Sequence, residues 1–310
     1  MSHGHGHGIS PRRGCDQQQR QACQQTVDRR RPRLVTFVLQ VTVGLFTSSL
    51  ALLSDSAHVF TDIFGIFMAL AAILVAQRAA RRPDRTFGMY RTEVFAALAN
   101  AILLFAVAGW VLYEAASRFT DPPEVPGLPV ATVAVVGLAM NVIAFLMLRS
   151  GAKESINIRG AYLEVMADMV GSIGVLVSGL VTLAFGWRYA DPVIGVAIGL
   201  FVLPRAFNLG RHAVRILLQQ APDRIDVTSI IEKINALPGV VDAHDLHVWT
   251  LTSGGMEVAS VHVTAVSDAD PTTVLAATRT LLAEVFELGG HATVQVELQG
   301  SDGKCAELAW

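Results

Sequence analysis

The sequence has few charged residues, few cysteines and no excess of positive charge. Only 16% of its 310 residues are charged, against about 25% in an average soluble domain. A net charge of −2 lacks the basic excess that is typical of nucleic-acid-binding proteins. Cys15, Cys23 and Cys305 are odd in number and lie in the terminal regions, which disfavours a disulfide framework. With 52% hydrophobic residues, this composition predicts a membrane protein.

Motifs for nucleotide-driven or hydrolytic chemistry are also absent. No Gly-x-x-x-x-Gly-Lys-Ser/Thr loop occurs, which disfavours a nucleotide cofactor and ATP-driven pumping. No His-Glu-x-x-His motif occurs, which disfavours an intramembrane metalloenzyme. We therefore expect no enzymatic activity.

The first 33 residues form a polar segment with seven arginines and no signal-peptide cleavage pattern. We expect a retained, disordered tail over residues 1–33. His3, His5 and His7 alternate with glycine there, and their imidazoles are candidate weak metal ligands. A cloning remnant or a solubility tail is the alternative interpretation.

Six apolar segments are long enough to span a bilayer, which needs about 20 residues of helix. They cover residues 34–53, 56–78, 93–116, 128–149, 161–186 and 190–212. Turn or charge signals bound them, among them Ser54-Asp55 and Asp191-Pro192. A six-helix transmembrane bundle over residues 34–212 is therefore expected. Arginine and lysine concentrate on the side that holds both termini, which predicts cytoplasmic termini in a multi-pass protein of the cell membrane.

After about residue 215 the pattern changes to that of a soluble domain. Helical periodicity over 226–237 and 271–288 alternates with β-branched stretches near 240–251, 257–266 and 292–298. This αββαβ order predicts a small α+β domain over residues 213–300, ferredoxin-like or metallochaperone-like, with a tail over 301–310.

Two pairs of polar residues interrupt the second and fifth apolar segments. His58 and Asp62 are four residues apart, as are Glu164 and Asp168, so each pair lies on one face of its helix. Each carboxylate at a helix centre opposes insertion by about 2.5–3.5 kcal/mol. A shared divalent cation offsets that cost, and four donors suit a tetrahedral Zn²⁺ site. The alternative is a structural hydrogen-bonded network, and for Asp55 it is a helix N-cap.

The soluble domain carries a second group of ligand-type side chains. Strand alternation places His262 opposite Val261 and Val263, and it places His291 and Glu297 on the face opposite the apolar residues of the last strand. His244 and His247 lie in the strand before them. We expect His244, His262, His291 and Glu297 to be candidate metal ligands, although simple alternation favours His247 over His244. Solvated surface histidines are the alternative.

Three stretches resemble the cation diffusion facilitator family. They are ALLSDSAHVFTD at 51–62, FGMYRTEVFAALAN at 87–100 and HDLHVWTLT at 244–252. The resemblance extends from residue 34 to about 298. It implies a six-helix, homodimeric exporter that exchanges Zn²⁺ or a related divalent cation for protons. It also implies a transport site at His58, Asp62, Glu164 and Asp168, and cytoplasmic sites at His244, His262, His291 and Glu297.

The chain departs from the family pattern at the transport site. Zinc-type members usually have histidine where this chain has Glu164, and a carboxylate makes the site harder and more anionic. Mn²⁺, Fe²⁺, Co²⁺ or Cd²⁺ is therefore an alternative main substrate. The loop at 83–88 lacks the histidines of an extra site, so no metal is expected there. A membrane-anchored metal sensor, which binds metal without flux, is the alternative class.

Overall fold

The computed structural model describes residues 30–79, 83–149, 156–252, 254–286 and 291–299. Within these residues, six apolar helices come first: α2 (Arg30–Thr47), α3 (Leu50–Ala79), α4 (Arg91–Arg118), α5 (Gly127–Arg149), α6 (Ile156–Phe185) and α7 (Ala190–Leu217). Five of them, α3 to α7, are long and apolar enough to cross a membrane, and the apolar part of α2 is shorter, at Leu34–Thr47. Long helices are favoured here because lipid leaves every backbone group to be satisfied within the segment.

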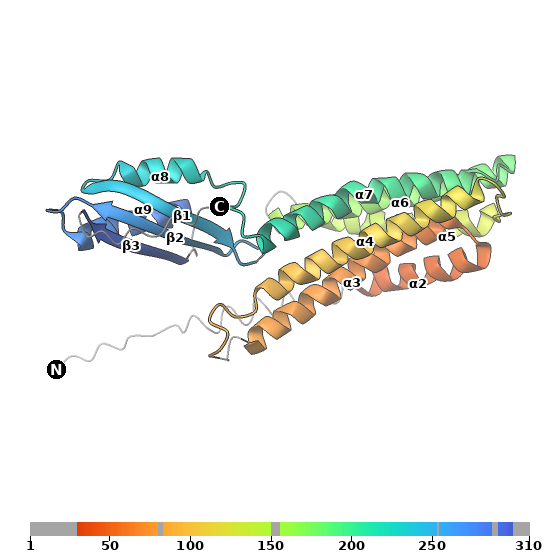
Figure 1. Cartoon of the computed structure of the whole chain (residues 1–310). Coiled ribbons are helices and arrows are strands. Elements are labelled where there is room, and N and C mark those ends of the chain that lie inside the picture. Colours follow the sequence, from red (N-terminus) through yellow and green to blue (C-terminus); the bar gives the residue numbers. More distant parts are fainter. Residues whose placement is uncertain (1–29, 80–82, 150–155, 253, 287–290, 300–310) are drawn as a thin grey trace, which may run out of the picture. The chain divides into compact units, whose positions relative to one another are not determined.

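The chain forms two compact units, each described by itself: Met1–Ile63 with Leu104–Pro204, and Phe64–Leu103 with Arg205–Trp310. In the first unit, α5 packs along α6 and also contacts α2 (Figure 1). Its core includes Ala51, Leu52, Val130 and Val175. In the second unit, Val94, Ala213 and Ile216 form a small cluster of buried side chains.

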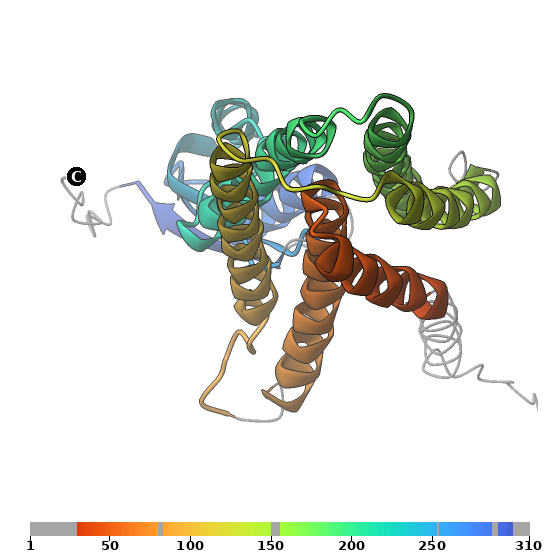
Figure 2. The same cartoon turned by 90° about the vertical axis from the view of Figure 1, so that its right-hand side faces the viewer.

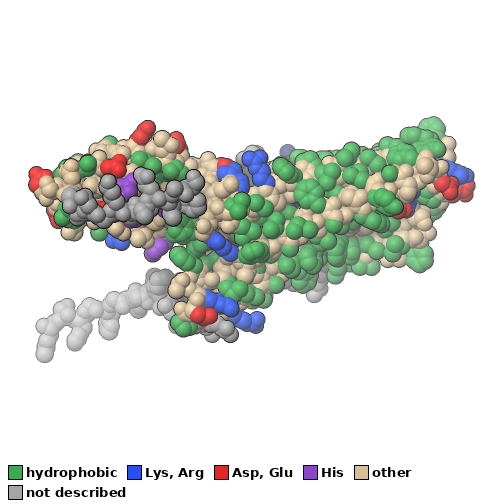
Figure 3. Space-filling view, viewed as in Figure 1, with side chains coloured by type: hydrophobic (Ala, Val, Ile, Leu, Met, Phe, Trp, Pro, Cys, Tyr) green, Lys and Arg blue, Asp and Glu red, His purple; other side chains and the backbone are tan. Residues whose placement is uncertain are grey.

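Hydrophobic side chains cover the outward faces of the helices (Figure 3). Phe46, Phe67, Tyr113, Met147 and Phe185 are all more than half exposed. Soluble monomers rarely carry an apolar surface of this extent, whereas lipid tails solvate it. The prediction of a multi-pass membrane protein is confirmed.

The turn between α2 and α3 lies earlier than the sequence predicts. The Ser54-Asp55 boundary is wrong: α2 ends at Thr47, Ser48 has a φ of 53°, and α3 begins at Leu50 (Figure 2). Ser49 caps α3, since its Oγ accepts the Leu52 N–H at 3.2 Å. Asp55 is therefore not an N-cap but lies inside α3.

The soluble domain has the element order α8 (Val227–Asn235), β1 (Val240–Thr250), β2 (Glu257–Ala265), α9 (Pro271–Val285) and β3 (His291–Leu298). Its sheet has the order β1-β2-β3, with β1 antiparallel and β3 parallel to β2. Ile234, Val261, Val263 and Leu282 are fully buried between the sheet and the helices. The predicted α+β class is confirmed, and alternation leaves one face of β2 for polar side chains.

Capping side chains fix where α8 and α9 begin. The Asp226 side chain accepts hydrogen bonds from the N–H groups of Thr228 and Ser229. Asp270 does the same at α9, and the Thr273 hydroxyl also donates to it, which lowers the pKa of Asp270.

Candidate metal centres

One cluster of ligand-type side chains lies inside the apolar helices. His58 and Asp62 share a face of α3, and Asp168 faces them from α6. His58 Nε2 is 3.4 Å from Asp168 Oδ1 and 3.8 Å from Asp62 Oδ2. One ligand atom from each of the three residues lies within 4.8 Å of the others. We call these three residues the membrane cluster.

The spacing within the membrane cluster suits a small divalent cation. Zinc is bound by histidine nitrogen and carboxylate oxygen at about 2.0–2.2 Å, so ligand atoms around a tetrahedral ion are roughly 3.4 Å apart. His58 and Asp168 are 9% and 8% exposed, so these polar groups lie almost out of contact with solvent. A cation would offset the mutual repulsion of the two carboxylates and their burial.

Glu164 lies outside the membrane cluster. It is half-buried, on α6 one turn before Asp168. Among the described residues of the apolar helices, the ligand atoms that come together are those of His58, Asp62 and Asp168. The fourth ligand thus remains a prediction.

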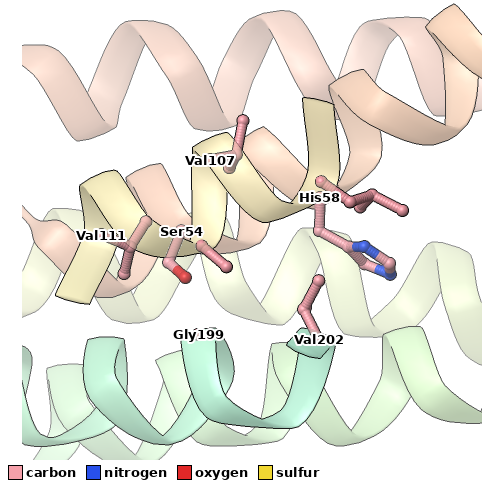
Figure 4. A pocket seen from close by; sticks show the side chains of 8 residues that line it. Ser54, His58, Val107, Val111, Gly199 and Val202 are labelled. Carbon is pink, nitrogen blue, oxygen red and sulfur yellow. The ribbon is translucent and has the colours of Figure 1, made fainter. Parts of the chain in front are cut away.

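A small, mostly apolar cavity adjoins His58. Its wall includes Val107 and Val111 of α4, and Gly199 and Val202 of α7. Figure 4 shows the His58 side chain between the α4 ribbon near Val107 and the α7 ribbon near Val202. Apolar walls keep the local dielectric low and so strengthen the electrostatic interactions of the imidazole.

Two hydrogen bonds between polar side chains near the membrane cluster were not predicted from the sequence. Gln40 of α2 donates from Nε2 to Asp55 Oδ2 at 2.6 Å, and Asn141 of α5 donates to Ser172 Oγ of α6 at 3.1 Å. Gln40, Asp55 and Ser172 are buried. The sequence signal was an amide at Gln40 within an apolar segment, where polar groups need partners.

The soluble domain holds another cluster, formed by His244, His262 and Glu297. His262 Nδ1 is 2.9 Å from Glu297 Oε1, and the rings of His244 and His262 have centroids 5.6 Å apart. Gln295 Nε2 also donates to Glu297 Oε1, at 2.8 Å. All three side chains are partly exposed, so a cation can reach them. We call them the cytoplasmic cluster.

An irregularity in β1 decides which histidine joins this cluster. The β1–β2 register shifts between His244 and His247, where Asp245 has a φ of 51°. His244 pairs with His262, whereas His247 pairs with Ser260. Simple alternation fails here because the irregularity changes which face of the strand each side chain joins.

His291 lies apart from the cytoplasmic cluster. It pairs with Val258, four residues along β2 from His262, which corresponds to about 13 Å of strand. The remaining predicted ligands, His3, His5 and His7, lie outside the described residues.

Comparison with known proteins covers both parts of the chain. The family model of the cation efflux transmembrane domain matches residues 33–218. The model of the cytoplasmic domain of cation efflux proteins matches residues 222–299.

Three relatives illustrate the similarity. The metal cation efflux system protein CzcD of Cupriavidus metallidurans is 44% identical over 265 residues, covering 85% of this chain and 83% of its own. The cadmium, cobalt and zinc/H(+)-K(+) antiporter of Bacillus subtilis is 35% identical over 268 residues, covering 84% and 85%. The zinc transporter ZitB of Escherichia coli is 33% identical over 276 residues, covering 87% and 86%.

Proposed function

The chain belongs to the cation diffusion facilitator family of cation efflux transporters, which are not enzymes, and on that premise we propose that it exports Zn²⁺ from the cytoplasm in exchange for protons. Cd²⁺ and Co²⁺ are further proposed substrates, since relatives are named for all three metals. The transport ligands would be His58, Asp62 and Asp168, with Glu164 as the fourth.

The membrane cluster is the observation that carries this proposal. An imidazole and two carboxylates from α3 and α6 bring their ligand atoms within 4.8 Å of one another. Ionisable groups inside a membrane are expensive, and they usually mark ion pathways. A structural hydrogen-bonded network does not need three metal-binding groups converging on one point.

Proton exchange follows from the chemistry of these ligands. Histidine and carboxylate bind a metal only in their deprotonated forms, so metal and protons compete for the same atoms. Protons arriving from the opposite side of the membrane would then displace the cation. The affinity has to stay below that of structural zinc sites, about 10–16 kcal/mol in apparent terms, or release would be too slow.

The cytoplasmic cluster supports a second, regulatory role for the same metal. We propose that the transporter is a homodimer and that metal bound at His244, His262 and Glu297 tightens the association of two soluble domains. Any such effect on transport is reciprocal, so a transport-competent state would also bind the regulatory metal more tightly.

Flux measurements in proteoliposomes test the proposed exchange. The purified full-length protein would be given Zn²⁺, Cd²⁺, Co²⁺, Fe²⁺ and Mn²⁺ separately, with and without a proton gradient. We expect uptake of Zn²⁺ and at least one further metal, driven by the gradient and abolished by a protonophore. Metal binding without flux of any cation would instead establish the sensor class.

Replacing Glu164 by histidine is expected to shift selectivity towards zinc. Imidazole is a softer ligand than carboxylate and suits Zn²⁺ better than Mn²⁺. We expect the ratio of Zn²⁺ to Mn²⁺ transport to rise at least about tenfold, because even a change to an outer-shell partner of a metal ligand alters affinity about 10–100-fold. An unchanged ratio would remove Glu164 from the coordination sphere.

Replacing His262 by alanine tests the regulatory role. His262 Nδ1 contacts Glu297 directly, so its loss breaks the centre of the cytoplasmic cluster. We expect metal-dependent dimer tightening to weaken by about 10–100-fold, as measured by the concentration dependence of dimerisation in detergent. His291→Ala, which lies outside the cluster, is the matched control and should change the dimer little.

A further inference from the structure

The contact between α3 and α6 continues one helical turn beyond the membrane cluster. Asp55 precedes His58 by three residues, and Gly171 follows Asp168 by three. Three residues of helix are about one turn, so Asp55 and Gly171 form the next layer of the same helix pair. A Cβ added to Gly171 would lie 2.8 Å from Asp55 Oδ1. The Asp55 carboxylate therefore fills the space that the glycine leaves.

Asp55 has little freedom to move out of this position. Its other oxygen accepts the 2.6 Å hydrogen bond from Gln40 of α2, and both residues are only 4% exposed. Gln40 is itself held close to α5, where a Cβ on Gly137 would lie 3.4 Å from its Nε2. Four helices thus hold the carboxylate against Gly171.

We propose that the Asp55–Gly171 contact sets the separation of α3 and α6 at the transport site, and so determines which cation radius the site prefers. The inference rests on the proposed function, because it assigns a specificity-determining role to residues beside the transport ligands. His58 and Asp62 come from α3, whereas Asp168 comes from α6, so the separation of the two helices fixes the distance across the site. Zinc needs ligands at about 2.0–2.2 Å, and a larger ion such as Cd²⁺ needs more room.

Gly171→Ala is expected to favour the larger ion. The new methyl group cannot coexist with Asp55 Oδ1 at 2.8 Å, and the Gln40 bond prevents the carboxylate from turning away, so the helices move apart. Since a 1 Å misplacement at a site can cost about 100-fold, a shift of a few tenths of an ångström should raise the Cd²⁺ to Zn²⁺ ratio of transport efficiency about tenfold.

Asp55→Ala is expected to act in the opposite direction. Removing the carboxylate empties the space beside Gly171 and lets α3 and α6 approach, which favours Zn²⁺ over Cd²⁺. In the double variant, the methyl group introduced by Gly171→Ala occupies the space that the Asp55 carboxylate vacates. The two effects should therefore be non-additive, and the ratio should return to within about twofold of wild type.

Two further variants distinguish the proposed control of helix separation from an effect of the Asp55 charge and from a general effect of adding a methyl group to α6. Asp55→Asn keeps the size of the side chain and an oxygen that accepts from Gln40, so it should retain the wild-type ratio. Gly174→Ala is the matched control on α6, because its new Cβ would lie 3.4 Å from Ile194 Cγ2, which is ordinary van der Waals contact.

The experiment measures Zn²⁺ and Cd²⁺ uptake by each full-length variant in proteoliposomes, with KM and maximal rate determined separately. Opposite shifts of the Cd²⁺ to Zn²⁺ ratio in the two single variants, cancelled in the double variant, would support the proposal that the Asp55–Gly171 contact sets the separation of α3 and α6. Equal ratios in all variants would overturn it, as would Asp55→Asn behaving like Asp55→Ala, which would indicate a charge effect. Absence of flux in the wild type would instead contradict the proposed function itself.

Discussion

Asp168→Asn is expected to reduce metal flux at least 100-fold while leaving the fold intact. Asparagine matches the shape of aspartate, but it supplies a neutral and much weaker ligand. Asp168 is the α6 member of the membrane cluster, and its Oδ1 lies 3.4 Å from His58 Nε2. A structural four-ligand zinc site holds its ion with about 10–16 kcal/mol in apparent terms, and a transport site holds it less tightly. One ligand of the transport site therefore accounts for roughly 2–3 kcal/mol, or about a factor of 100 in affinity.

The control for this variant is Asp121→Asn. Asp121 is an exposed acid between α4 and α5, so the same chemical change there should leave uptake unaltered. Flux would be measured in proteoliposomes under one fixed proton gradient, after equal reconstitution of each protein has been verified. Wild-type flux in Asp168→Asn would contradict a transport role for the membrane cluster and return its acids to a structural network.

A second measurement on the same variant reports on proton coupling. Metal binding releases the protons that its ligands carried, so the number released depends on how many ligands titrate. Asp168→Asn removes one of the carboxylates for which metal and protons compete in the proposed exchange. Calorimetry of Zn²⁺ binding in buffers of different ionisation enthalpy should therefore show fewer protons released per metal than in wild type. Equal proton release would place proton exchange on groups other than Asp168.

Local periodicity was enough to find the centre of the membrane cluster. His58 and Asp62 meet because they are four residues apart on one helix, and that relation needs no knowledge of the fold. Their approach to Asp168 requires α3 and α6 to pack together, which the sequence suggests through the cost of isolated acids in lipid and through the family resemblance. For the Gln40–Asp55 hydrogen bond, the sequence indicates only that the Gln40 amide needs a partner. It does not point to Asp55, because it predicts a turn there.

In the soluble domain, too, some features of the site follow from the sequence and others do not. Its element order and the polar face of β2 follow from composition and from period-two alternation. The choice between His244 and His247 does not, because the register shift between them depends on how β1 pairs with β2. Such irregularities are fixed by pairing across strands, which a single strand's pattern does not record.

The boundary between α2 and α3 was mispredicted because a distant residue determines it. The sequence marks Asp191 only as part of an Asp-Pro turn before α7. In the structure, its carboxylate accepts hydrogen bonds from Ser49 Oγ at 2.5 Å, from Leu50 N at 2.6 Å and from Ala51 N at 3.3 Å. A residue more than 140 positions away thus satisfies the free N–H groups at the start of α3.

Asp191→Ala should consequently destabilise the membrane domain more than any surface substitution. Asp191 is fully buried, and Arg118 Nη1 lies 3.8 Å from its Oδ2. Alanine leaves the Ser49 hydroxyl, two backbone N–H groups and this guanidinium without the Asp191 carboxylate. Each of the three buried hydrogen-bond donors that loses its partner costs about 1–3 kcal/mol, so the total is roughly 3–9 kcal/mol.

Thermal unfolding of the detergent-solubilised protein measures this loss. At about 2–4 °C per kcal/mol for a domain of this size, the midpoint should fall by roughly 6–36 °C. Glu124→Gln is the matched control, since the Glu124 and Arg188 side chains are 77% and 53% exposed and a surface ion pair contributes about 0–1 kcal/mol. Asp191→Asn should fall between the two, because its amide oxygen still accepts from α3. Equal midpoints for Asp191→Ala and Glu124→Gln would mean that α3 does not depend on α7 for its N-terminal cap.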